Sequence, residues 1–270
     1  MTISEIKKDT ATDKALFVDL NCDLGQSYGV YRNEPELQLV PYVSSVSISC
    51  GLHAGDPLTI MNMLKLAAEN NLSVGAHVGY PDIQGFGYRG LQLTDEEMQA
   101  VIVYQIGALA SLAKLYCINV EFVRPHGALY RQAAEDYKVA YSLAKAVAAY
   151  DPWLVLVGAP SEHLDRAGEE ANLRIAKELQ LDKKYDVNGN IDFSLGDVID
   201  VDYSTRLLDS IIKHSSVINT QGGRTKVKYN TIHLNMRDAS SVEIAKKAAS
   251  MVPSPVTIPG TFVANSGWLE

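Results

Sequence analysis

Cysteine is scarce in this sequence, and the cysteines that are present are not spaced as pairs. There are three, Cys22, Cys50 and Cys117, an odd number with no CxxC spacing. This pattern does not suggest a disulfide framework, and it is typical of a reducing compartment. Their apolar neighbours predict buried core residues rather than reactive nucleophiles.

Long basic runs and long apolar runs are also missing. The formal net charge of −8 argues against a nucleic-acid-binding protein, which usually carries a basic face. No stretch approaches the roughly 20 apolar residues that a membrane span requires. The first fifteen residues, MTISEIKKDTATDKA, lack the apolar centre of a signal peptide, and we expect a poorly ordered tail over 1–15. These features together predict a cytoplasmic protein that does not bind membranes.

Two motifs that often carry chemistry are absent from the chain. There is no phosphate-binding loop of the form GxxxxGK[ST], so we expect no ATP binding to this chain by that route. There is also no HExxH pair of histidines, so a metal site cannot be predicted from that motif.

Short apolar runs alternate with helical patterns along most of the 270 residues. The runs predict strands within 16–21, 43–51, 72–77, 120–127, 153–158, 173–179 and 229–236. Helices are predicted over 56–71, 93–116, 135–150, 161–171, 204–214 and 240–252. Asp56 with Pro57 predicts the start of one helix, and Thr94 with Glu97 predicts a capping box at another.

A sustained alternation of strands and helices favours a parallel sheet. Because no Pro-, Gly- or Ser-rich linker divides the chain, we expect one domain over 16–270. About seven strands predict a closed or nearly closed βα barrel, with an open doubly wound sheet as the alternative. The weakly periodic segment 183–203 is predicted to be an irregular excursion.

The stretch FVDLNCDLGQSYG places polar residues at every second position of the first strand. Asp19, Asn21 and Asp23 should therefore share one face. A solvated face is the simplest explanation, but the inner face of a parallel barrel is not solvated. The three side chains are thus candidates for one wall of a pocket.

The following three strands also end in polar side chains. Because functional groups in parallel α/β folds gather at the carboxyl ends of strands, we expect these side chains to share one rim. They are His53 and Asp56 after the second strand, His77, Tyr80, Asp82 and Arg89 after the third, and Arg124, His126 and Tyr130 after the fourth.

Two chemistries fit such a rim. Asp23, His53 and His126 could ligate a divalent metal, and imidazole and carboxylate ligands favour zinc. Alternatively, Asp19, Asp23, His53, His77 and His126 could move protons without a metal. Arg124 is a candidate anchor for a substrate carboxylate. The remaining substrate-binding candidates are Asn21, Asp56, Tyr80, Asp82 and Tyr130.

Five ordered runs of the sequence resemble the LamB/YcsF family of lactam-utilisation proteins. They are VDLNCDLGQSYG, ISCGLHAGDP, VGAHVGYPDIQGFGYRG, YQIGAL and VRPHGALY, within residues 17 to 160. The resemblance implies a distorted βα barrel akin to the glycoside hydrolase/deacetylase superfamily. It places Asp19, Asn21, Asp23, His53, His77 and His126 at the family's polar motif positions.

The resemblance also implies an activity, which is opening of the lactam ring of 5-oxo-L-proline to L-glutamate at the expense of ATP. In the family this reaction requires partner subunits B and C, and the ATP is consumed by the complex. A homo-oligomer is left open by the sequence.

Three positions depart from the family pattern. Gln26 stands where relatives carry a glutamate, Lys183 stands in place of an arginine, and the HLNMRD run around His233 differs from the usual Val-His-Gly-Asp. Two alternatives therefore remain beside the lactam hydrolase. One is a non-catalytic or altered-substrate member, and the other is a metal-dependent hydrolase of the deacetylase type.

Overall fold

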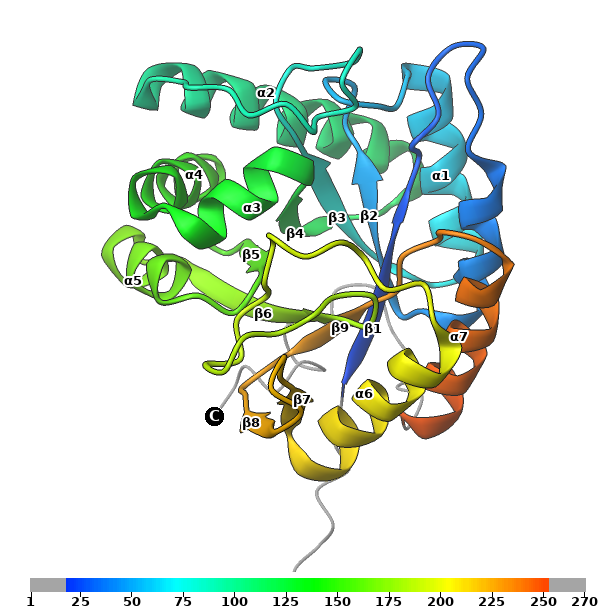
Figure 1. Cartoon of the computed structure of the whole chain (residues 1–270). Helices are drawn as coiled ribbons and strands as arrows, with labels where there is room; N and C mark the ends of the chain where they lie inside the picture. The colour runs from blue at the N-terminus through cyan, green and yellow to red at the C-terminus, as the bar shows by residue number, and fades with distance from the viewer. Residues whose placement is uncertain (1–17, 253–270) are drawn as a thin grey trace, which may run out of the picture.

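Seven parallel strands close into a barrel in the computed structural model, which describes residues 18–252 (Figure 1). Their order around the barrel is β1-β2-β3-β4-β5-β6-β9, and β9 pairs with β1 to close the sheet. The strands are β1 (Asp19–Leu24), β2 (Ser45–Ser49), β3 (Ser73–Val78), β4 (Val120–Pro125), β5 (Val155–Gly158), β6 (Arg174–Gln180) and β9 (Thr231–His233). The predicted barrel is confirmed, and the open sheet is excluded. The predicted tail over 1–15 lies outside the described residues, as do residues 253–270 of the predicted domain.

Helices surround the sheet (Figure 1). They are α1 (Pro57–Glu69), α2 (Asp95–Ala113), α3 (Gly127–Glu135), α4 (Tyr137–Tyr150), α5 (Glu162–Ala171), α6 (Val201–His214) and α7 (Ala239–Met251), with 3-10 helices η1 (Glu34–Tyr42) and η2 (Lys114–Tyr116). Both predicted helix starts are confirmed. Asp56 accepts hydrogen bonds from the backbone N–H groups of Leu58 and Thr59, and Thr94 forms the capping box with Glu97.

The interior of the barrel holds both an apolar cluster and charged side chains. Phe122, Val155, Val157 and Ala176 form a buried cluster across β4, β5 and β6. Gly75 of β3 leaves room for the Phe122 ring, because a Cβ at this glycine would lie 2.2 Å from that ring. Further along β4 and β6 the buried side chains are charged, since Arg124 pairs with Glu178 inside the barrel, so the candidate site can extend into the interior.

Four elements of the structure were not predicted from the sequence, and the first is the 3-10 helix η1. The helix predicted over 135–150 is α4. The helix before it, α3, was not predicted, because Pro125 and Gly127 at its start are residues typical of turns. A small antiparallel pair, β7 (Ser216–Ile218) and β8 (Arg224–Lys226), was also missed, because strands of three residues carry too little periodicity. Residues 183–200 form the predicted excursion, with only isolated bridges at Tyr185.

Two compositional expectations need correction. Cys117 is exposed rather than part of the core, whereas Cys22 and Cys50 are buried. Among the described residues, one helical stretch, Asp95–Tyr116, is long and apolar enough to cross a membrane by length and composition. Within the fold this stretch contacts α4, β3 and β4, as expected of a helix in the outer layer of the barrel.

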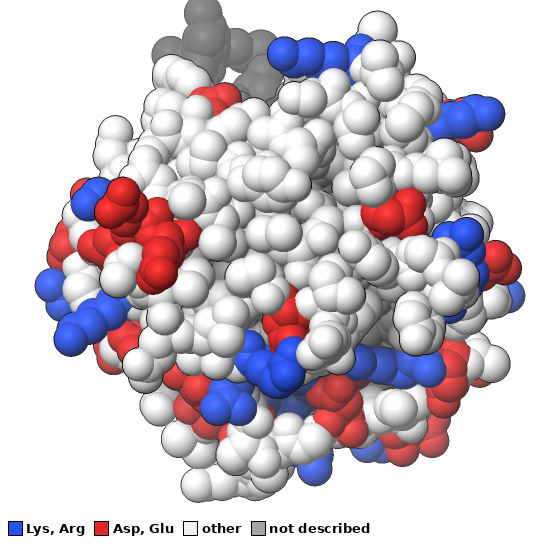
Figure 2. Space-filling view, turned by 90° about the horizontal axis from the view of Figure 1, so that it is seen from above, with Lys and Arg blue, Asp and Glu red and all other residues white. Residues whose placement is uncertain are grey.

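Acidic and basic side chains are interspersed on the face seen from above (Figure 2). Much of that face carries neither kind, and the charged groups gather toward its margins and in a band of both signs. It therefore shows no extended basic surface of the kind that a nucleic acid would require.

Candidate functional site

The polar side chains of β1 occupy three successive levels of the barrel interior. Asp19 is at the lowest level, where β1 begins, and its carboxylate accepts hydrogen bonds from Ser44, Ser45 and Thr231 at 2.6, 2.9 and 2.6 Å. Burial raises the pKa of Asp19 despite these bonds. Asp19 does not line the pocket, so the prediction that it is catalytic is not supported by its position. The alternation along β1 correctly predicts that Asp19, Asn21 and Asp23 share one face of the strand. It cannot show how far each residue lies from the pocket end of the barrel.

Asn21 lies one level higher and links three strands. Its amide nitrogen donates to Glu178 Oε1 at 3.2 Å and to Thr231 Oγ1 at 2.6 Å, and its oxygen lies 2.6 Å from His233 Nδ1. These contacts are all buried. Asn21 therefore positions Glu178 and His233 rather than facing a substrate.

Asp23 is at the carboxyl end of β1, where charged groups converge on it. Arg124 Nη1 lies 3.0 Å from Oδ1, and His77 Nε2 and His233 Nε2 lie 3.3 and 3.5 Å from Oδ2. Burial alone would raise the pKa of Asp23, but Arg124, His77 and His233 hold it well below its ordinary value. Asp23 is therefore ionised, and 10% of its side chain remains exposed.

Arg124 is held between two carboxylates inside the barrel. Its Nε lies 2.8 and 3.0 Å from the two oxygens of Glu178, its Nη2 lies 2.7 Å from Glu178 Oε2, and its Nη1 faces Asp23. The guanidinium also lies 5.0 Å from the centre of the Tyr130 ring. Burial would raise the pKa of Glu178, but Arg124 and His233 outweigh it, and the pKa is lowered. Because its donors are largely taken up, Arg124 is better suited to fixing Asp23 than to anchoring a substrate carboxylate.

His53, His77 and His126 form one buried cluster beside Asp23. The rings of His53 and His126 are stacked at 4.2 Å, and His77 Nε2 lies 3.0 Å from His126 Nδ1. Burial lowers the pKa of His126 to about 3, with a further contribution from His77. Burial, followed by His126 and His77, also lowers the pKa of His53.

The hydrogen bonds of two of these histidines fix their protons. Carbonyl oxygens only accept, so His77 donates through Nδ1 to Arg124 O at 3.1 Å, and His126 donates through Nε2 to Phe86 O at 2.7 Å. His77 Nε2 then faces both His126 Nδ1 at 3.0 Å and Asp23 Oδ2 at 3.3 Å, so His77 links the histidine cluster to the carboxylate.

The three histidines could hold a metal ion, because their ligand atoms lie within 4.8 Å of one another. This group differs from the predicted ligand set, since His77 takes the place of Asp23. In the present arrangement an ion would have to displace the bond between His77 and His126. The stacked rings of His53 and His126 also lie in nearly parallel planes, 8° apart, so their in-plane lone pairs do not converge. Metal binding would thus require the rings to reorient.

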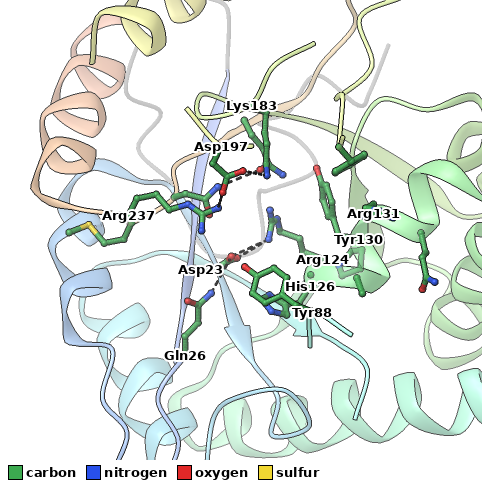
Figure 3. A pocket seen from close by; sticks show the side chains of 18 of the residues that line it. Asp23, Gln26, Tyr88, Arg124, His126, Tyr130, Arg131, Lys183, Asp197 and Arg237 are labelled. Atoms are coloured by element: carbon green, nitrogen blue, oxygen red, sulfur yellow. Dashed lines mark hydrogen bonds and ion pairs between the residues drawn. The ribbon is translucent and has the colours of Figure 1, made fainter. Parts of the chain in front are cut away.

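A pocket of about 410 Å³ opens above Asp23 (Figure 3). This volume is in the range of small-molecule sites. Of the predicted residues, Asp23, Arg124, His126 and Tyr130 line it, while His53 and His77 lie behind His126. Gln26 also lines it, with its amide nitrogen 3.4 Å from Asp23 Oδ2.

Besides Asn21, three predicted substrate-binding residues do not line this pocket. Asp56 caps α1 and also accepts from the backbone N–H of Gly29 at 3.0 Å. Tyr80 donates to Gln132 Oε1 at 2.6 Å, and Asp82 is paired with Arg89. Each of these three side chains is occupied by local structure, so the structure does not support a role in binding for them.

The sequence analysis did not assign a site role to several residues near Asp23. Glu178 and His233 are buried beside it, and Lys183, Asp197 and Arg237 line the pocket. Period-two alternation of Ala176, Glu178 and Gln180 could have indicated that Glu178 faces inward. The strand-end argument used for His53, His77 and His126 applies equally to His233.

Residues Gly25 to Gly29 have the G-x-S-x-G pattern of a nucleophile elbow, and the interpretation of the sequence as lacking this motif is wrong. An elbow requires a strand, a sharp turn and an α-helix, with a histidine near the serine. Here Ser27 Oγ accepts from the backbone N–H of Asn33 at 2.8 Å, and a 3-10 helix follows. Ser27 therefore supports the loop rather than acting as a nucleophile.

The buried histidines predict that acid destabilises the fold. An unfolded histidine has a pKa near 6.5, whereas burial holds that of His126 at about 3, so the unfolded chain binds more protons between these values. The stabilisation is present above about pH 6.5 and is lost as the pH falls toward 3. We expect the urea midpoint of His126→Gln to change less than that of the wild-type chain between pH 7 and 5. His214→Gln, at an exposed position on α6, should follow the wild-type slope, and equal slopes for all three proteins would contradict the prediction.

Comparisons with known proteins agree with this architecture. The model of the LamB/YcsF family matches residues 18–256. The chain is 40% identical over 233 residues to the 5-oxoprolinase A subunit of Geobacillus kaustophilus, covering 85% of this chain and 91% of the relative. It is 37% identical over 233 residues to the Bacillus subtilis protein of the same name, with 85% and 91% covered.

A solved structure is similar as well. The lactam utilization protein from Thermus thermophilus superposes with a TM-score of 0.80 at 33% identity, covering 87% of this chain and 95% of that one. Family, relatives and fold all agree with the resemblance seen in the five sequence runs. The chain therefore belongs to the LamB/YcsF family.

Proposed function

We propose that this chain is the A subunit of a 5-oxoprolinase, which opens the lactam ring of 5-oxo-L-proline to L-glutamate. Family membership supports the class of substrate, because relatives of 34 to 44% identity carry the name of the 5-oxoprolinase A subunit. The observation that carries the proposal is Asp23, an ionised carboxylate on the wall of a small-molecule pocket, with the Arg124 guanidinium and the His77 ring fixed behind it.

Asp23 is the group we assign to the proton transfers. Opening a lactam adds the oxygen of water to the ring carbonyl, breaks the C–N bond and moves a proton to the departing nitrogen. Asp23 takes the proton from water as the oxygen attacks, and returns it to the nitrogen as the ring opens. Arg124, His233 and the His77–His126 pair are positioning groups that hold Asp23 in place, and the Arg124 guanidinium balances its charge.

The ATP and the partners belong to the complex in this proposal. The sequence has no GxxxxGK[ST] loop, so we assign ATP consumption to an assembly with subunits B and C. The proposed location is the cytoplasm. No step depends on a metal, since His77 and His126 already hydrogen-bond to each other and support Asp23 through that pair.

The test is reconstitution of the complex. The purified chain is combined with the B and C subunits encoded in its own genome, and glutamate release from 5-oxo-L-proline is measured with and without ATP. We expect release that requires all three proteins and ATP. If this mixture is silent while the Bacillus subtilis relative with its own partners is active, the proposal fails.

A further inference from the structure

Four cationic side chains line the pocket, and they differ in how fully their charge is balanced. Arg124 lies between Asp23 and Glu178, as described above. Arg131 on α3 pairs with Glu135 one turn further along the helix, at 3.0 Å, and its side chain is 59% exposed. The other two are Lys183, which follows β6, and Arg237, which follows β9.

Lys183 and Arg237 converge on a single carboxylate (Figure 3). Lys183 Nζ pairs with Asp197 Oδ1, and Arg237 Nη2 lies 2.7 Å from Asp197 Oδ2. Asp197 and Lys183 both belong to the excursion between β6 and α6, with Lys183 at its start, three residues after β6, whereas Arg237 lies four residues after β9. All three side chains therefore come from segments without regular structure.

Arg237 keeps its place independently of Asp197. Its Nε lies 3.2 Å from Asp182 Oδ2, and Asp182 also accepts from Asn235 Nδ2 at 3.1 and 3.0 Å. Burial would lower the pKa of Arg237, but Asp182 and Asp197 outweigh it and raise the pKa. If Asp197 moved away, a positioned guanidinium and an ammonium would remain at the pocket wall.

We propose that Lys183 and Arg237 form the binding site for the carboxylate of the substrate, a site that Asp197 occupies in the free protein. The inference rests on the proposed function, because it concerns an amide substrate that also carries a carboxylate. Exchange of one carboxylate for another leaves neither cation unpaired, so the displacement has a small electrostatic cost. An arginine held on one side and a lysine on the other also suit the planar geometry of a carboxylate.

This assignment revises the prediction that Arg124 is the anchor. Arg124 directs its Nε and Nη2 to Glu178 and its Nη1 to Asp23, whereas Lys183 and Arg237 face a group that can be replaced. Asp23 lines the same pocket. A substrate held by its carboxylate at this wall is thereby retained in the space that Asp23 faces.

The test compares steady-state kinetics of the reconstituted complex for four variants. Lys183→Met and Arg237→Met should each raise KM for 5-oxo-L-proline by roughly 10- to 100-fold with kcat changed little, as for loss of a charge-assisted contact. Arg166→Met, which removes a cation that pairs with Glu170 on α5 outside the pocket, should leave KM unchanged. Asp197→Asn should lower KM, because the competing carboxylate is gone. An unchanged KM in the first two variants, or a raised KM in Asp197→Asn, overturns the proposal.

A second measurement needs no variant, and it covers the case in which a substitution prevents folding. Binding of 5-oxo-L-proline and of its neutral amide, 5-oxo-L-prolinamide, to the wild-type complex is measured by calorimetry. We expect the amide to bind at least about 10-fold more weakly, as for loss of a charge-assisted contact, and equal affinities would overturn the inference. Turnover of 5-oxo-L-proline by the wild-type complex tests the proposed function separately, so the two failures can be told apart.

Discussion

Asp23→Asn should lower kcat of the reconstituted complex by roughly 10²- to 10⁴-fold, the range expected when a proton-transfer group is removed. The amide has nearly the same volume and can still contact Arg124 and His77, but it cannot accept the proton of the attacking water. We therefore expect KM to change much less than kcat. The measurement is glutamate release under saturating ATP.

Asp19→Asn is the matched control for this substitution. It makes the same chemical change on the same face of β1, four residues away, where the carboxylate contacts only Ser44, Ser45 and Thr231 in the described structure. Asp19→Asn should change the free energy of unfolding of the chain while leaving kcat within a few-fold of the wild-type value. Equal losses of kcat in the two variants would mean that Asp23 has no special role.

Arg124→Met should destabilise the isolated chain by about 3–5 kcal/mol, because it leaves Asp23 and Glu178 buried without their shared cation. Glu178 is fully buried, so its charge has no access to water. The measurement is the free energy of unfolding in urea at neutral pH.

The double variant Arg124→Met with Glu178→Gln separates charge from packing. Removing the unpaired carboxylate should restore part of the lost stability, giving a non-additive cycle. A double variant whose loss equals the sum of the two single losses would show that the pair is not energetically coupled.

The distribution of polar residues along the sequence was sufficient to predict the barrel and much of the rim. Four strand ends carry Asp23, His53, His77 and His126, and parallel strands place such ends at one edge. The structure shows that Asp23 and His126 line the pocket and that His53 and His77 lie behind them. The five sequence runs that resemble the family lie in this same half of the chain. The strand-end positions and the family resemblance therefore both predicted a site built from these residues.

The second half of the site was not predictable in the same way. Glu178 and His233 come from β6 and β9, and His233 contacts Asp23 across more than 200 residues of chain. Glu178 and His233 come close to Asp23 only because the barrel closes between β9 and β1. The periodicity of the sequence cannot reveal this closure. Lys183, Asp197 and Arg237 meet through an excursion without regular structure, so no period in the sequence indicates that they lie together.

The sequence by itself determined the alternation of parallel strands and helices, the helix caps at Asp56 and Thr94, and the polar face of β1, because these depend on periods and local hydrogen bonds. Tertiary structure alone decided the depth and the charge of each group. It placed Asp19 at the end of the barrel away from the pocket and Asp23 at the pocket, although both lie on one face of one strand. It also paired Arg124 with two carboxylates and left Lys183 and Arg237 sharing one. The physical reason is that depth, burial and charge balance depend on which distant side chains meet inside the closed barrel.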